Sequence, residues 1–141
     1  MKSLYNKLND KQFTKLKLKL IALENKVVIP FCNKNKISLD RERYYEISLA
    51  INLHKEDKDF KYSASLYYNE EKSLFSFGVI KYFDIEDKRY YKEKDLEKNK
   101  PLEYFNETIL SEILKESLDL YNSWDRSDLN EFIERTPPPK Y

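Results

Sequence analysis

Three successive segments in the middle of the chain alternate apolar and polar residues with a period of two. These are residues 45–53, 60–68 and 73–83, joined by connections of only a few residues. A period of two is typical of a half-buried strand, and short connections pair consecutive strands antiparallel. The chain turns once more at 84–88. The sequence therefore predicts an antiparallel β-meander of four to five strands with one buried face.

An N-terminal helix is expected to precede the meander, from about Asn9 to Lys26. Asn9 can cap it, and Gln12 stands three residues later, as in a capping box. An apolar stripe follows at three- and four-residue spacing: Phe13, Leu16, Leu20, Leu23 and Val27. The alternation of Lys and Leu over 15–20 would also suit a half-buried strand, so the helix rests on its capping signals and length. The β-branched run 27–29, which ends at Pro30, predicts a short edge strand.

A long C-terminal helix is expected from about Pro101 to Trp124. Its apolar residues fill more than half of the helix circumference, which predicts burial on two sides, against the sheet and against another helix. Ser127 is placed to cap a short last helix that runs through Ile133. The expected fold class is therefore α+β, with one domain over 1–135 and a proline-rich tail over 136–141.

Charge is distributed unevenly along the chain. Residues 1–36 carry nine Lys against two acids, a net +7, and residues 101–141 carry four basic groups against nine acids, a net −5, although the whole chain sums to +1. If the two ends pack together, their charges attract each other and largely cancel. If they lie apart, each offers an electric field to a partner.

Few residues in this sequence could act as catalytic groups or bind a metal or cofactor. His54 is the only imidazole and is expected in an exposed turn, while Cys32 is expected to be a small buried side chain. One Cys and one His cannot fill a tetrahedral zinc site, and a single glycine excludes glycine-dependent phosphate loops. Three Glu-x-Lys triplets, at 56–58, 70–72 and 86–88, fall in predicted turns rather than on core strands. We therefore expect no catalytic residue, no bound metal and no cofactor.

The features that remain point to a surface that binds another protein. Tyr67 and Tyr82 place aromatic rings on otherwise polar or outward strand faces, and tyrosine is common at binding surfaces. Carboxylates can occupy phosphate sites in the basic cleft of a nuclease. The sequence therefore predicts a non-enzymatic module, in particular an immunity- or antitoxin-like protein that neutralises a toxin. Its candidate acidic contacts lie on or just after the long helix: Glu112, Glu116, Asp119, Asp125 and Asp128.

Two alternatives stay open at this point. The first is nucleic-acid binding through the basic N-terminal helix, with strand aromatics stacking on bases; its phosphate contacts would be Lys7, Lys11, Lys15, Lys17, Lys19 and Lys26. The second is a metal-dependent hydrolase built on carboxylates. The sequence shows neither a membrane-spanning run nor a signal peptide, so we expect a cytoplasmic protein, and its oligomeric state is left open.

Overall fold

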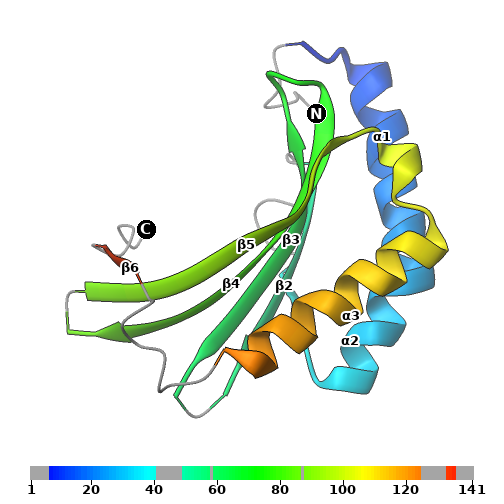
Figure 1. Cartoon of the computed structure of the whole chain (residues 1–141). Coiled ribbons are helices and arrows are strands. Elements are labelled where there is room, and N and C mark those ends of the chain that lie inside the picture. Colours follow the sequence, from blue (N-terminus) through cyan, green and yellow to red (C-terminus); the bar gives the residue numbers. More distant parts are fainter. Residues whose placement is uncertain (1–6, 41–48, 58, 87, 125–132, 136–141) are drawn as a thin grey trace.

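The computed structural model describes residues 7–40, 49–57, 59–86, 88–124 and 133–135. They form two layers: a curved antiparallel sheet, and helices that cover one face of it (Figure 1). The expected α+β class and the antiparallel sheet are thus confirmed. The other face of the sheet, turned away from the helices, is called the open face below.

Over the described residues the sheet has six strands that follow one another in chain order, each antiparallel to the next. The four long strands form the predicted meander, and a three-residue strand extends it at either edge. Side chains alternate as the period of two predicts: Tyr62, Ala64 and Leu66 are buried under the helices, and the residues between them are not. The strands are β1 Ser38–Asp40, β2 Ala50–Glu56, β3 Lys61–Asn69, β4 Leu74–Ile85, β5 Lys88–Lys100 and β6 Ile133–Arg135.

The N-terminal helix begins where the capping signals indicate. In α1, Asp10–Leu23, the Gln12 amide N–H donates to Asn9 Oδ1 at 2.8 Å, and the Asn9 amide N–H donates to Gln12 Oε1 at 3.0 Å. This reciprocal pair satisfies two amides that a helix start would otherwise leave unpaired. The chain stays helical beyond Lys26, through the π-helical turn η1, Glu24–Val28, and then α2, Ile29–Asn35.

The predicted edge strand at 27–29 is wrong, because this run belongs to the helical segment. Val27 and Val28 are almost fully buried, so tertiary packing overrides their β-branched preference. The Ile29 amide N–H reaches back five residues to the Glu24 carbonyl, which is the wide spacing of a π turn. Pro30, which has no N–H to donate, follows this π turn directly, in the first turn of α2.

The C-terminal helix starts later than expected. Pro101 precedes a 3₁₀ turn, η2 Leu102–Tyr104, and α3 spans Glu107–Ser123 with Asn106 as its cap, accepting from the Ile109 amide at 2.9 Å. The helix packs between β4 and the η1 turn, which confirms its burial on two sides. The predicted short last helix falls largely outside the described residues, and Ile133, its last position, begins β6.

Candidate binding surface

The open face of the sheet presents a continuous row of polar and aromatic side chains. Strand β3 contributes Lys61, Ser63, Ser65 and Tyr67, none of them in the buried core. Because directly opposed residues of an antiparallel pair share a face, the strand register sets the neighbours of this row. The neighbours on β4 and β5 are Gly78, Ile80, Tyr82, Asp84, Arg89, Tyr91, Glu93 and Asp95.

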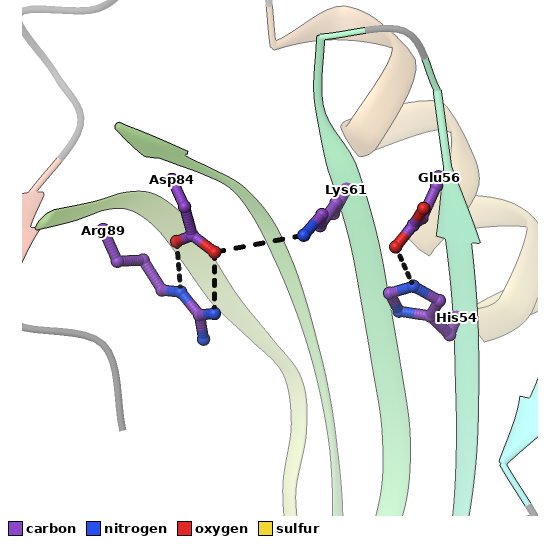
Figure 2. A network of polar contacts seen from close by, with 5 residues as sticks. All are labelled: His54, Glu56, Lys61, Asp84 and Arg89. Atoms are coloured by element: carbon purple, nitrogen blue, oxygen red, sulfur yellow. Dashed lines mark hydrogen bonds and ion pairs between the residues drawn. The ribbon is translucent and has the colours of Figure 1, made fainter. Parts of the chain in front are cut away.

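One end of the open face holds a network of charged groups (Figure 2). The Arg89 guanidinium donates to both carboxylate oxygens of Asp84, at 2.7 and 3.1 Å, and Lys61 Nζ lies 3.9 Å from the same carboxylate. The hydrogen bond with Asp84 raises the pKa of Arg89. The guanidinium also lies over the Tyr82 ring, 4.3 Å from its centroid. These contacts hold Tyr82 and Arg89 in one orientation on the open face, and side chains that are already oriented lose less entropy on binding than free ones do.

His54 lies within β2 and not in the turn that the sequence predicted. The strand continues to Glu56 because the ladder with β3 persists there, with Glu56 opposite Lys61. His54 Nε2 lies 3.3 Å from Glu56 Oε1 (Figure 2). Because these two residues lie opposite Ser63 and Lys61 of β3, both are on the open face. His54 is therefore part of the same surface as Asp84 and Arg89.

A furrow of about 130 Å³ crosses the middle of the open face. It is lined by Ser63, Ser65 and Gly78 together with the larger Tyr67 and Ile80, and by β5 residues that include Glu93 and Asp95. Gly78 is the only glycine of the chain, and its φ angle is not positive, so the backbone does not require glycine there. A Cβ at this position would lie 3.2 Å from Asp95 Oδ1. The missing side chain therefore makes the furrow.

The β5 edge of the furrow is irregular. The pairing with β4 shifts between Phe77 and Gly78, which leaves an extra residue on β5. Bulges of this kind re-aim side chains and recur next to functional sites. Here the shift directly follows the Gly78–Asp95 pair, and the Asp95 carboxylate lies across the position that a residue-78 side chain would occupy.

Charge is balanced at one end of the open face and negative at the other. Asp84 is neutralised by Lys61 and Arg89. At the furrow, Asp95 pairs with Lys98 at 3.4 Å, and Glu93 makes no ion pair with any residue that the structure describes. Lys94 also lines the furrow, but it lies opposite Val79, on the helix-covered side of the sheet. The furrow thus carries the Glu93 carboxylate, unpaired among the described residues, beside aromatic and aliphatic walls, and this charge suits a basic side chain.

The structure divides the predicted partner-binding residues between two surfaces. Tyr67 and Tyr82 lie on the open face, half-buried. Glu112, Glu116 and Asp119 are exposed on the outer side of α3, which covers the opposite face of the sheet. Asp125 and Asp128 lie outside the described residues. Sequence reasoning missed the furrow residues Gly78, Glu93 and Asp95, although a lone glycine inside an alternating strand pattern is itself a signal of close approach by a ligand.

The basic and acidic ends of the chain pack together in part. Lys19 Nζ lies 2.9 Å from Glu103 Oε1, and Lys26 Nζ lies 3.3 Å from Glu107 Oε2. The hydrogen bond from Lys19 lowers the pKa of Glu103. Two of the six lysines predicted to contact phosphates are thus paired with acids of the same chain. Lys7, Lys11 and Lys15 remain exposed.

Cys32 lies on α2 and is buried in the core. Burial raises the pKa of its thiol to about 11, and the charge of nearby Glu24 acts in the same direction. The thiol is therefore protonated at neutral pH and poorly nucleophilic. Among the described residues, no three His, Cys, Asp or Glu side chains are grouped to hold a metal ion.

The chain matches no protein-family model, no curated protein and no solved structure. Of the helices that the structure describes, none is long and apolar enough to cross a membrane.

Proposed function

We propose that this chain is a small non-enzymatic module that binds another protein, as an immunity- or antitoxin-like inhibitor does, and that the open face of its sheet is the contact surface. The partner would be basic at the contact, as the nucleic-acid cleft of a nuclease toxin is. Binding of this kind would neutralise the toxin by covering its cleft, and the electrostatic match would speed the encounter.

The observation that carries this proposal is the furrow at Gly78. Glycine in the interior of a strand weakens the strand by roughly 0.5–1 kcal/mol relative to alanine, and no positive φ requires it here. Glycine here leaves room for the Asp95 carboxylate to lie across position 78, at the border of the open furrow. A partner group that pairs with this carboxylate would enter the furrow at that point. Glu93 and Asp95 border that space, so a lysine or arginine side chain of the partner fits it best.

The charge on the surface favours a protein partner over nucleic acid. A phosphate backbone at the open face would meet Glu93 and Asp95, and two of the basic helix side chains already pair with Glu103 and Glu107. Nucleic-acid binding through the remaining lysines predicts an affinity that falls steeply with salt on any duplex or single strand. A salt titration with an unrelated duplex and an unrelated single strand therefore separates the two functions.

The acidic side of α3 is the second surface that a basic partner could contact. Glu112, Glu116 and Asp119 share one exposed side with Lys115 and make no ion pair within the described part of the chain. An exposed helix face of this composition is ordinary in soluble proteins. We therefore place the main contact on the open face, and the experiment below includes the α3 acids as a separate test.

The test is affinity capture from the organism that encodes the chain, with three immobilised proteins in parallel. The first is the wild type, the second carries Glu93→Gln and Asp95→Asn, and the third carries Glu112→Gln, Glu116→Gln and Asp119→Asn. All the substituted side chains are exposed, so each protein is expected to keep its thermal midpoint. We expect one basic protein to be retained in stoichiometric amount by the wild type and the α3 variant, and at least tenfold less by the furrow variant.

Two results would overturn the proposal. One is that no protein is retained by the wild type at physiological salt. The other is that retention survives in the furrow variant and is lost in the α3 variant, which would move the contact to the helix layer.

A further inference from the structure

A second surface, on the helical side of the molecule, has the shape and charge of a peptide-binding groove. It runs between α1 and the segment from Pro101 to Glu107, and it has two lobes of about 420 and 540 Å³. Leu102 and the Lys19–Glu103 ion pair line both lobes, so the pair forms a ridge between them. The groove thus consists of two lobes separated by one narrow ridge.

Both lobes have apolar floors. The first lobe is lined by Leu8, Leu16 and Phe75 in addition to Leu102, and the second by Ala22, Leu23 and Phe105. Leu16 and Leu23 are seven residues apart on one helix, which places the lobes about 10 Å apart at ~1.5 Å per residue. Two apolar side chains at positions i and i+7 of a second helix have the same separation. A helix lying along α1 could therefore place one anchor in each lobe, on either side of the ridge.

The rim of the groove is basic. Lys7, Lys15, Lys19 and Lys26 border the two lobes, against Glu103 and Glu107. The two glutamates are paired with Lys19 and Lys26. Lys7 and Lys15 make no ion pair among the described residues, although the charge of Lys15 also helps to lower the pKa of Glu103. Glu70 lies nearby and accepts a hydrogen bond from the Lys7 main-chain amide at 3.0 Å. The excess positive charge therefore sits at the Lys7–Lys15 end.

From this geometry we infer that the groove between α1 and η2 binds an acidic amphipathic helix of a partner protein, with apolar anchors at i and i+7 and carboxylates facing Lys7 and Lys15. The apolar floors favour apolar side chains as anchors, and the lysines at the rim favour carboxylates on the partner helix. This site is independent of the furrow on the open face, because the sheet separates the two surfaces.

The test uses a synthetic fluorescent helical peptide with two leucines seven residues apart and glutamates beside them. Binding is measured by fluorescence anisotropy, together with a second peptide in which lysines replace the glutamates and a third in which alanines replace both leucines. We expect measurable affinity for the first peptide, and at least tenfold weaker affinity for the other two.

Matched variants of the protein locate the binding. Lys15→Glu and Ala22→Glu change exposed residues that line the first and second lobe, and Lys11→Glu reverses an exposed charge on the same helix outside both lobes. We expect Lys15→Glu and Ala22→Glu to weaken binding of the acidic peptide at least tenfold, and Lys11→Glu to weaken it less than twofold. The furrow variant with Glu93→Gln and Asp95→Asn should bind the peptide as the wild type does.

Three results would overturn the inference. The first is no binding of the acidic peptide, and the second is equal weakening by Lys11→Glu and Lys15→Glu. The third is a dimer of the protein alone in sedimentation velocity that Lys15→Glu dissociates, because the groove would then belong to a second copy of the chain. None of these results bears on partner capture by the open face, so the two proposals fail separately.

Discussion

Lys81 Nζ donates a hydrogen bond to the main-chain carbonyl of Tyr121 at 2.8 Å, which ties strand β4 to the C-terminal end of α3. The same ammonium group donates to the carbonyl of Trp124 and lies 4.5 Å from the centroid of the Phe60 ring. The last carbonyls of a helix lack intrahelical donors and carry partial negative charge, so a buried cation is well matched to them. The side chain of Lys81, on β4, therefore caps the C-terminal end of α3.

Replacing Lys81 by methionine should destabilise the fold by roughly 2–4 kcal/mol, because a charged donor is lost and buried carbonyls are left without it. Urea unfolding followed by circular dichroism measures this loss. Lys61→Met is the control, since Lys61 lies on the open face with a half-exposed side chain and a 3.9 Å ion pair, and it should cost less than about 1 kcal/mol. A loss below about 0.5 kcal/mol for Lys81→Met would contradict the capping role.

Alkaline pH should destabilise the protein through Tyr62. Its hydroxyl lies 2.7 Å from Ser117 Oγ, and because the Ser117 hydroxyl donates to the Leu114 carbonyl, Tyr62 is the donor. Burial raises the pKa of Tyr62 to about 12 from the ordinary value of 10.0. The unfolded chain thus loses this proton first, so stability is full below pH 10 and falls as the pH rises toward 12.

The loss from Tyr62 alone should reach roughly 1 kcal/mol by pH 11. Urea midpoints at pH 9 and pH 11 measure it, with Tyr62→Phe as the comparison, because phenylalanine keeps the ring that packs against Tyr121 and cannot ionise. The variant should lose about 1 kcal/mol less than the wild type between the two pH values. Equal losses would show that Tyr62 does not remain protonated in the folded state.

Cys32 should resist thiol reagents while the protein is folded. Its side chain is 3% exposed and the pKa of its thiol is raised to about 11, so both access and thiolate fraction are low. Reaction with a chromogenic disulfide reagent at pH 8 should be complete within minutes in 8 M urea and slower by at least 100-fold in buffer. Rapid labelling of the native protein would show that the α2 region opens far more readily than its packing implies.

Gly78→Ala should raise the stability of the fold and weaken partner binding. An alanine is compatible with the φ angle at this position, so it should stabilise the fold by about 0.4–1 kcal/mol, provided that the Asp95 carboxylate 3.2 Å away moves aside. The same methyl group narrows the furrow and should weaken partner binding. The thermal midpoint and the amount of captured partner are the two readouts. Weaker binding that accompanies a lower midpoint would count against a direct role for the furrow.

The sequence predicts well which residues face the buried side of the sheet. This is because the two-residue alternation of apolar and polar side chains along each strand can be seen within a short stretch of sequence. Phe75, Phe77 and Val79 alternate with outward residues and are all buried. The same reasoning fails at Val27 and Val28, whose local preference is for strand but which pack in a helical turn. The helical apolar stripe reaches Val27, but the β-branched run and the proline after it favour a strand by local preference. The packing of the η1 turn against α3 and the neighbouring helices supports the helical structure instead.

The candidate site could be predicted only in part, and for a related reason. Tyr67 and Tyr82 stand out in the sequence because they interrupt a polar or outward pattern. Gly78 lies opposite Asp95 in a register that runs unbroken back to the pair Ile85–Lys88, and the shift at Phe77 lies beyond it. The sequence predicts a turn within 84–88 but not which residues form its tip, so it does not determine which residue of β5 faces Gly78. Glu93 and Asp95 are ordinary acids in a highly charged chain until the sheet places them beside the lone glycine.

The most direct test of the open-face proposal is a titration of the ¹⁵N-labelled chain with the captured partner, followed by NMR. Gly78 is the only glycine, so its amide signal reports on the furrow alone. We predict that this signal, with those of Ser65 and Asp95, shifts or broadens first and saturates at one equivalent of partner. An unchanged Gly78 signal, with the changes confined to α1 or α3, would contradict the proposal.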